Sequence, residues 1–592
     1  MQQDSYEHNA VNRVRFWYAL LTIVFGVFAI RLFYLQIVRF NHYTQAARSD
    51  QVHEYEVVPE RGAVYAQTSD GDAVPLVVNQ RLYTLYADPM VVKSSPETAS
   101  KLAPLIGKDA RALEELLANK KRRYVVLAKR LTKQQHTAVL ELKLPGVGTQ
   151  ERNYRTYPQG TMAAQLLGFV DEEGKGRYGL EQAMNATLAG TNGWLKAVTD
   201  INGVPLAAND NNLSKKPVPG SSVTLTLDLG MQAQLEGIVK RTQEKFRSKT
   251  VSAVVLETQT GAVKAMANYP TYDPAKFQEV EDGALFQNSA VTNAIEPGSI
   301  TKILTTAAAL DKGVVTPNST YNDPGKWVID GAKVLNVAEG KGSGPQNIRN
   351  ILDYSLNTGA TWELMQLGGG SINQTARSAL YDYFVGHYQM SKKTGIEQGY
   401  ESTGYVPEAN DNGAGINLTY ANMSFGQAYN ATAIQMASAL SAIVNGGTYY
   451  RPTLVASIEK NVGQTTLQKP EVVKSNVVSE QVSKDMVGLL DYVTASHVKA
   501  GFKYMDFGTQ YSVGGKTGTA EISKTDGGYR TDVYNGTFMG YVGGDTPQYT
   551  IVVYNIEPRN YSGYAGAQTG QPVFAEIAHM LIDNYNVTPK SR

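Results

Sequence analysis

A long apolar segment near the N-terminus is the feature that most constrains this chain of 592 residues. Residues Phe16 to Val38 are apolar almost throughout, and Arg31 is the one charged side chain among them. As an α-helix the segment would be about 34 Å long, which is enough to cross the hydrocarbon core of a bilayer. Arg31 lies toward its C-terminal end, where a long side chain can reach the membrane interface. The sequence therefore predicts a transmembrane helix.

The residues that flank this segment predict its orientation. Arg13 and Arg15 lie on the short N-terminal side and favour a cytoplasmic N-terminus, although Arg39 on the other side weakens that bias. Everything after the helix is then expected outside the cytoplasm. The alternative is a cleaved signal peptide with a weak cleavage site at Thr44–Ala47, but the apolar run is long for such a segment.

Length, charge and composition limit the remaining possibilities. A chain of this length is expected to fold as two or three domains. Its 55 basic and 54 acidic residues lack the strong positive charge typical of nucleic-acid-binding proteins. Cysteine is absent, which excludes disulfides, thiolate metal sites and cysteine nucleophiles. The seven histidines show no metal-ligand spacing, so we predict no metal and no cofactor, while a Ser-His-Asp triad assembled from distant residues stays open.

The region before residue 222 shows no recognisable chemistry. Short strand-like runs such as His53–Val58 and Leu82–Asp88 alternate with a charged helical stretch at residues 110–123. Residues 211–222 are rich in Pro, Ser and Lys, which is typical of a linker.

The region after this linker predicts a sheet built from both of its ends. Alternation of β-branched residues at 221–228 and at 252–270, around a turn at 259–261, predicts strands and a hairpin. Residues 511–522 and 536–556 predict further strands near the C-terminus. Helical patterns lie between the two groups, so we expect one sheet closed by the two ends of an α+β domain.

A buried helix in this domain carries an unexpected lysine. Pro297, Gly298 and Ser299 suit a helix start, and the apolar run that follows ends at Gly313. Positions i and i+3 share a helix face, so the Lys302 amine can approach the Ser299 hydroxyl. An amine in a dry site can act as base for a serine nucleophile, and the helix N-terminus supplies partial positive charge for an oxyanion.

Two short motifs follow this Ser-x-x-Lys pair. Ser355-Leu356-Asn357 lies in a segment of small residues, and Lys516-Thr517-Gly518 lies in a strand-like segment with flanking glycines. Each motif alone is weak because such patterns occur by chance in many chains. Their order and their separations, about 50 and about 160 residues, match the set found in β-lactamases and penicillin-binding proteins.

On these residues the chain resembles the class B penicillin-binding proteins, and the likeness covers nearly all of it. Further similar segments are RLFYLQ (31–36), ERG (60–62), RTYPQGTMAAQLLGFV (155–170), GRYGLEQAMNATLAG (176–190), SFGQ (424–427) and TAIQMASALSAIVNGG (432–447). The chain departs from the family at Ala66 and Gln67, where an acidic residue and an arginine are common, so the pedestal contacts attributed to that pair are in doubt.

The resemblance implies a multidomain α+β architecture. A single transmembrane helix would precede a mixed, noncatalytic pedestal domain and a transpeptidase domain of the serine β-lactamase-like fold, with an antiparallel sheet flanked by helices. The expected boundaries are 1–15 for a cytoplasmic tail, 16–38 for the anchor, 39–215 for the pedestal and 216–592 for the transpeptidase domain. The localisation implied is the cytoplasmic (inner) membrane.

The resemblance also implies roles for the motif residues. Ser299 would be the acyl nucleophile and Lys302 its base, while Ser355 would relay a proton toward the leaving amine and Asn357 would bind the amide of the donor peptide. The substrate implied is a peptidoglycan stem peptide that ends in D-Ala-D-Ala and is joined to an amine of a neighbouring strand.

The third motif would bind the donor. Lys516 and Thr517 would hold its terminal carboxylate, and Gly518 would let the strand edge approach. The backbone N–H of Thr519 would form the oxyanion hole together with that of Ser299.

The residues around the motifs also bear on the biological role. EPGS (296–299) and SLNTGA (355–360) are more similar to the cell-division branch than to the elongation branch, and the division enzymes work with a SEDS-family glycosyltransferase and other divisome membrane proteins. β-Lactam antibiotics would be inhibitors.

Several alternatives stay open: an elongation enzyme, a β-lactamase or carboxypeptidase of the same fold, and a membrane-anchored β-lactam sensor. The long pedestal and the anchor disfavour a hydrolase, and the short N-terminal tail disfavours a sensor. No glycosyltransferase motif supports a bifunctional class A protein.

Overall fold

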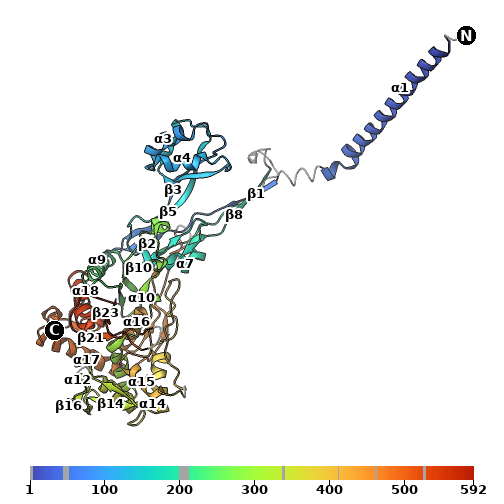
Figure 1. The fold of residues 1–592 in the computed structure, drawn as a ribbon. Coiled ribbons are helices and arrows are strands. Elements are labelled where there is room, and N and C mark those ends of the chain that lie inside the picture. Colours follow the sequence, from blue (N-terminus) through green and yellow to red (C-terminus); the bar gives the residue numbers. More distant parts are fainter. Residues whose placement is uncertain are drawn as a thin grey trace. The chain divides into compact units, whose positions relative to one another are not determined.

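The computed structural model describes residues 4–43, 52–198, 213–336, 340–410, 413–460, 463–524 and 528–591 (Figure 1). By the density of its contacts the chain separates into two compact units. Residues 1–60 with 190–219 form the first unit, and residues 61–189 with 220–592 form the second. This division differs from the predicted boundary at residues 215 and 216, which remains a prediction.

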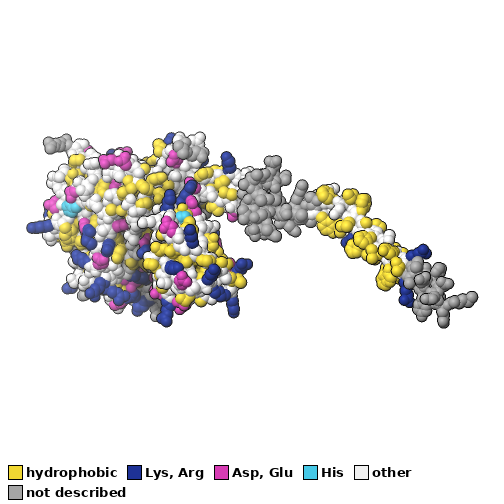
Figure 2. Space-filling view, turned by 90° about the horizontal axis from the view of Figure 1, so that it is seen from above, with side chains coloured by type: hydrophobic (Ala, Val, Ile, Leu, Met, Phe, Trp, Pro, Cys, Tyr) yellow, Lys and Arg dark blue, Asp and Glu magenta, His cyan; other side chains and the backbone are white. Residues whose placement is uncertain are grey.

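The first unit contains the apolar helix and a small sheet. Helix α1 (Asp4–Phe33) continues as one π-helical turn, Tyr34–Val38. In α1 and this turn together, residues 13–38 form the one stretch of the described chain that is long and apolar enough to cross a membrane. Figure 2 shows the apolar surface of this stretch in yellow. Strands β1 (Val52–Val57), β8 (Gly193–Val198) and β9 (Leu213–Lys215) pair in that order. Part of the predicted linker is therefore a strand; the alternative cleavage site at 44–47 lies outside the described residues.

The second unit begins with strands and helices of the predicted pedestal. The strands are β2 (Val64–Gln67), β3 (Ala73–Ala87), β4 (Val125–Leu131) and β5 (Val147–Thr156). The helices are α3 (Ser95–Ile106), α4 (Ala110–Ala118) and α5 (Lys133–Glu141), which pack against β3 and β4 around a core that includes Leu85, Leu102, Leu113 and Leu127. Helix α4 covers only the first part of the stretch predicted at 110–123, because Asn119 leaves the helical conformation and ends the helix.

A seven-stranded sheet joins this region to later parts of the chain. Its order is β19-β18-β10-β2-β3-β4, with β5 paired to β3. Strand β10 (Ser222–Asp228) lies parallel to β2 and antiparallel to β18 (Val455–Glu459), which pairs in turn with β19 (Thr465–Leu467). The strand expected at 221–228 therefore belongs to this sheet and not to the catalytic one, because its two edges pair with β2 and β18.

The predicted sheet of the catalytic domain is present and is closed by both ends of the domain. Its five antiparallel strands are, in spatial order, β12 (Val263–Tyr269), β11 (Thr250–Glu257), β23 (Pro547–Ile556), β22 (Asn535–Gly543) and β21 (Ser512–Ala520). Strands β11 and β12 form the predicted hairpin. Strand β21 is at the edge of the sheet.

Both faces of this sheet are buried. Along β11, Val251, Ala253 and Val255 pack in one core with helices α9 (Leu229–Phe246) and α18 (Gln571–Asn584), whereas Val254 and Leu256 face a second core. Successive side chains of a strand point to opposite faces, which explains this alternation. Figure 1 shows α9 and α18 close to β23.

The second core contains the helical middle of the domain. Its helices are α11 (Lys302–Asp311), α12 (Ile348–Asp353), α13 (Asn357–Leu367), α14 (Gln374–Tyr381), α15 (Ile416–Ser424), α16 (Ala433–Val444) and α17 (Glu480–Lys499). All residues of α16 are buried, and this helix packs on β11 and β23. A helix that is apolar all round requires such a position.

The shorter elements include β6 (Phe169–Val170), β7 (Gly176–Arg177), α6 (Ala164–Leu167), α7 (Gly179–Ala183), α8 (Asn185–Ala189), α10 (Ser289–Thr292) and the hairpin β14 (Lys326–Ile329) with β15 (Ala332–Leu335).

Candidate active site

The predicted serine and lysine lie at the start of α11, as the spacing requires. Residues Gly298–Thr301 form one 3₁₀ turn, and the α-helix begins at Lys302. Gly298 has φ = 68°, and a Cβ there would lie 2.8 Å from the carbonyl oxygen of Thr519, so only glycine fits this turn. Ser299 is half-buried and Lys302 is fully buried. The reactive hydroxyl therefore stays accessible while the amine is kept from water.

The amine of Lys302 is the centre of the site. Its Nζ atom lies 2.8 Å from Oγ of Ser299 and 2.8 Å from Oδ1 of Asn357. It also lies 2.9 Å from the carbonyl oxygen and 3.0 Å from Oγ of Ser355. An ammonium has three hydrogens for these contacts, whereas a neutral amine has two and a lone pair that can accept the Ser299 hydroxyl proton. The geometry suits a free amine that is ready to take a proton.

Local backbone structure fixes Ser355 and Asn357 against this amine. Ser355 joins α12 to α13 with φ = 57°, a left-handed conformation that turns both its carbonyl and its hydroxyl toward Lys302. The Nδ2 group of Asn357 donates to the carbonyl of Leu335 at 2.9 Å, which directs Oδ1 toward the lysine. The first two predicted motifs are thus brought together.

Burial makes the Lys302 ammonium unfavourable. Desolvation lowers the pKa of Lys302 well below its ordinary value, and the nearby charge of Lys516 lowers it further. Glu363 opposes this shift. Burial and the neighbouring positive charge therefore favour the free amine over the ammonium.

The third motif lies on the edge strand β21. Lys516 is buried, and its Nζ lies 3.2 Å from the carbonyl oxygen and 3.3 Å from Oγ1 of Thr517. Burial lowers the pKa of Lys516 to about 8, against the attraction of Asp353. Thr517 and Thr519 are partly exposed along the same strand. The Oγ1 of Thr519 accepts from the backbone N–H of Gly566 at 3.0 Å.

Gly518 brings this strand against the serine turn. A Cβ at this position would lie 2.2 Å from Oγ1 of Thr537 and 2.8 Å from the carbonyl oxygen of Pro297. The same Thr537 hydroxyl donates to Pro297 at 2.8 Å. Strand β21 and the turn before Ser299 are therefore held in direct contact, and all three predicted motifs belong to one site.

Comparison with known proteins identifies the family. Residues 251–579 match the penicillin binding protein transpeptidase domain, and residues 56–225 match the penicillin-binding protein dimerisation domain. The chain belongs to the class B penicillin-binding proteins. It is a peptidoglycan D,D-transpeptidase with a serine transpeptidase domain.

Relatives of this class B penicillin-binding protein align over most of its length. Stage V sporulation protein D of Bacillus subtilis is 28% identical over 590 residues, which are 98% of this chain and 87% of that protein. Penicillin-binding protein PbpB of Mycolicibacterium smegmatis is 30% identical over 450 residues, which are 75% and 67% of the two chains. The crystal structure of penicillin binding protein 3 from Mycobacterium tuberculosis, complexed with aztreonam, has a TM-score of 0.66 at 25% identity and covers 90% of this chain and 98% of its own.

The SFGQ segment supports the serine turn of this penicillin-binding protein. The N–H of Gly298 donates to the carbonyl of Gly426 at 3.0 Å, and the Thr305 hydroxyl donates to the carbonyl of Ser424 at 2.7 Å. Gln427 donates to Glu521 at 2.6 Å. The sequence showed this segment only as one similar to the family; its contact with the serine turn was not predicted, because it depends on how segments distant in the chain pack together.

Two acidic residues near the site were also missed. Glu296 accepts from Tyr529 at 3.2 Å and from the backbone N–H of Ala428 at 3.1 Å. Glu363 lies within α13 and accepts from the Thr306 hydroxyl. Single acidic residues give no signal in one sequence, so only the structure reveals them.

Three of the pedestal segments that resembled the family meet in a buried ion cluster. Glu181 is fully buried, and Arg61 lies 2.5 Å from its Oε2 while Arg155 lies 2.8 Å from its Oε1. Arg155 also donates to Asn79 at 3.0 Å and to the carbonyl of Gly62 at 2.7 Å. Ala66, at the position that departs from the family pattern, is buried in β2. The cluster joins segments far apart in the sequence.

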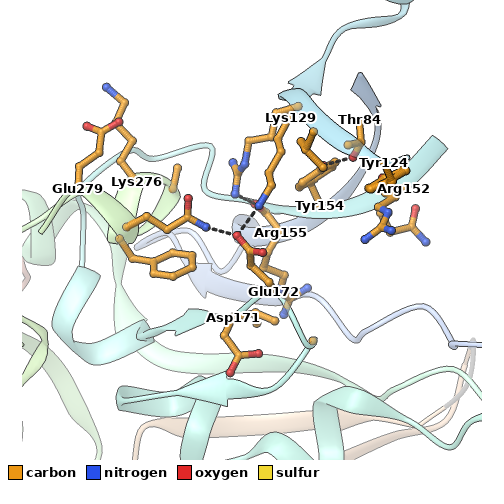
Figure 3. A pocket seen from close by; sticks show the side chains of 18 residues that line it. Thr84, Tyr124, Lys129, Arg152, Tyr154, Arg155, Asp171, Glu172, Lys276 and Glu279 are labelled. Carbon is orange, nitrogen blue, oxygen red and sulfur yellow. Dashed lines mark hydrogen bonds and ion pairs between the residues drawn. The ribbon is translucent and has the colours of Figure 1, made fainter. Parts of the chain in front are cut away.

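A separate pocket of about 580 Å³ lies away from the three motifs (Figure 3). Its lining comes from β3, β4 and β5, the β6–β7 turn and the 3₁₀ helix Pro274–Glu279, and none of the three motifs contributes to it. Glu172 accepts from Lys129 and, at 2.7 Å, from Gln278, so one carboxylate connects two of these elements across the pocket (Figure 3). Among the described residues no cluster of potential metal ligands is present.

Proposed function

We propose that Ser299 is the acyl nucleophile of this transpeptidase and Lys302 its general base. The observation that carries this proposal is the 2.8 Å contact between the buried Lys302 amine and the Ser299 hydroxyl. Ser299 Oγ attacks the carbonyl carbon of the penultimate D-alanine, and its proton passes to Nζ of Lys302. Ser355, 3.0 Å from the same Nζ, passes a proton to the departing terminal D-alanine. An ester between Ser299 and the donor peptide remains.

The remaining motif residues bind the donor. Asn357 hydrogen-bonds its amide, while Lys516 and Thr517 hold the terminal carboxylate through a charge-assisted contact. Gly518 keeps the strand edge close to the serine turn, and the N–H groups of Ser299 and Thr519 stabilise the oxyanion. The amine of a neighbouring stem peptide then attacks the ester carbonyl and loses its proton to Lys302. Lys302 returns this proton to Oγ of Ser299 as the ester C–O bond breaks and the cross-link forms.

The same site is proposed to react with β-lactam antibiotics, because a relative of 25% identity is complexed with aztreonam. The test is labelling of the full chain with fluorescent penicillin and mapping of the modified residue. Ser299→Ala should abolish the label, and Lys302→Ala should slow labelling by about 10²–10⁴-fold, the usual cost of losing a general base. A label on another residue would refute the assignment of Ser299 as the nucleophile.

The lifetime of the label separates a transpeptidase from a β-lactamase. A hydrolase must activate water against the ester, and no acidic residue in the three motifs suits that task. We expect the protein to stay acylated long after free penicillin is removed. Release within seconds, with an excess of hydrolysed penicillin, would favour the β-lactamase alternative.

We further propose that the chain crosses the cytoplasmic membrane once, with residues 1–15 inside and the catalytic domain outside. The apolar helix at residues 13–38 and the arginines that precede it support this orientation. The proposed boundaries remain 16–38 for the anchor, 39–215 for the pedestal and 216–592 for the transpeptidase domain. Protease added to intact spheroplasts should digest the catalytic domain, and a mature N-terminus near Ala47 would instead show a cleaved leader.

A septal role with a SEDS-family glycosyltransferase and other divisome proteins is the finer proposal. The EPGS and SLNTGA segments support it, whereas the alignment of 98% of the chain with a sporulation protein supports a second candidate. Depletion in the native host distinguishes them. Filamentous cells would support the septal role, rounded cells an elongation role, and normal growth with defective spores the sporulation role.

A further inference from the structure

Helix α13 carries a carboxyl group that the proposed chemistry leaves unused. The side chain of Glu363 is fully buried, and no salt bridge to it is found among the described residues. Its oxygens lie 3.0 and 3.1 Å from Oγ1 of Thr306, which is also fully buried. A buried acid with a single hydroxyl partner is unfavourable in its charged form.

The position of this carboxyl relates it to the lysine. Thr306 lies one helical turn after Lys302 on α11, so both residues lie on one face of that helix. Glu363 lies on α13, the helix that begins with Asn357, whose Oδ1 contacts Lys302. The carboxyl is therefore part of the interface between the two helices that carry the base and its amide partner.

The charged and titratable groups that interact with this pair belong to other elements of the domain. The charge of Lys516 on β21 lowers the pKa of Lys302, and the charge of Glu363 raises the pKa of Tyr321. The charge of Asp353 raises the pKa of Lys516, and the charge of Lys516 lowers that of His497. Among the described residues, Lys302 is the one charged side chain that shifts the pKa of Glu363.

Glu363 is neutral under ordinary conditions. Burial raises its pKa to about 8, and the Thr306 hydrogen bond and the charge of Lys302 act in the opposite direction. Burial thus favours a neutral Glu363 and a free Lys302 amine. Two neutral groups avoid the cost of a buried ion pair.

We propose that Glu363 is a positioning residue that acts through Lys302: a neutral Glu363 leaves the amine free to accept the Ser299 proton, and an ionised Glu363 stabilises the ammonium that forms. The inference rests on the proposed role of Lys302. The acylation rate should then depend on two coupled ionisations, that of the amine and that of the carboxyl.

The pH dependence of acylation tests this proposal. The rate constant for labelling by fluorescent penicillin would be measured from pH 5 to 10 with the full chain in detergent. The wild-type rate should rise first as Lys302 loses its proton and again, by about threefold, as Glu363 ionises near pH 8; this corresponds to half a pKa unit of coupling. Glu363→Gln should keep the rate at pH 7 within about threefold and lose the second rise.

A second variant changes the carboxyl without removing it. Thr306→Val deletes the hydroxyl that favours the ionised form, so the second rise should move to higher pH, and Thr306→Ser should restore it. Glu401→Gln is the matched control, because Glu401 is buried and accepts from the Thr394 hydroxyl at 2.6 Å without an effect on Lys302. That control should keep the wild-type profile.

The outcomes separate this inference from the proposed function. A second rise that persists in Glu363→Gln would overturn the role of Glu363, even when Ser299 is confirmed as the labelled residue. If the variants fail to fold, infrared titration of the wild-type chain remains. A carboxylic-acid band that persists above pH 7 and changes when penicillin acylates the protein supports the proposal, and its absence refutes it.

Discussion

Oδ1 of Asn357 lies 2.8 Å from Nζ of Lys302, although the two residues are 55 positions apart in the chain. The contact is possible because Ser355 turns the chain between α12 and α13 and because Leu335 fixes the Asn357 amide. A neutral acceptor at this point binds the lysine without adding a negative charge. The neutral Asn357 side chain therefore does not favour the ammonium form of Lys302.

Asn357→Asp should expose the importance of that neutrality. A carboxylate this close favours the ammonium and raises the pKa of Lys302 by about one to three units. The acylation rate at pH 7 should fall about tenfold or more and recover in part at higher pH. Asn373→Asp, at the cap of α14, is the control and should leave the profile unchanged. An equal loss at every pH would mean that geometry, not charge, is responsible.

Lys516→Ala should impair recognition of the substrate carboxylate. The buried ammonium beside the Thr517 hydroxyl on an open strand edge suits an anion. Acylation by penicillin should slow much more than acylation by an uncharged ester of similar reactivity. Competition labelling with both reagents measures the ratio; Lys326→Ala, on an exposed strand, should not change it. If Lys516→Ala slowed acylation by both reagents equally, Lys516 would have no specific role in binding the carboxylate.

Glu181→Gln should destabilise the pedestal region. The buried carboxylate pairs with both Arg61 and Arg155, and breaking a buried charge pair costs about 3–5 kcal/mol. The midpoint of thermal unfolding should fall by several degrees, as measured by calorimetry in detergent. Glu115→Gln, at an exposed position, should leave it unchanged. An unaltered midpoint in Glu181→Gln would show that the cluster adds no net stability.

Glu296 should make the stability depend on pH. Burial raises its pKa to about 6 from 4.5, so the folded chain holds this proton more tightly than the unfolded chain. Its contribution to stability is therefore complete below about pH 4.5 and is lost as the pH rises through about 6. As the pH rises from 5 to 7, the unfolding midpoint of Glu296→Gln should increase relative to that of the wild type. A difference that stays constant, as expected for Glu115→Gln, would contradict this cause.

The site was largely accessible from the sequence because its chemistry lies in short local motifs. Ser299 and Lys302 share a helix face by their spacing alone, and the glycines around Lys516 marked a strand that other backbone could approach. The alternation along β11 and β12 likewise predicted a hairpin, since periodicity of two is a local property. The placement of β10 was not predictable, because alternation does not specify a strand's partners.

The sequence by itself determined the apolar N-terminal helix, the order of the three motifs and the strands at both ends of the catalytic domain, because local spacing and composition encode these. Only the tertiary structure decided that Glu363 contacts Thr306 one helical turn after Lys302, that Gly518 lies against Pro297, and that β10 pairs with β2. These relationships depend on packing between segments distant in the chain. Burial and electrostatic coupling arise from that packing, and a single sequence carries no periodic signal for either.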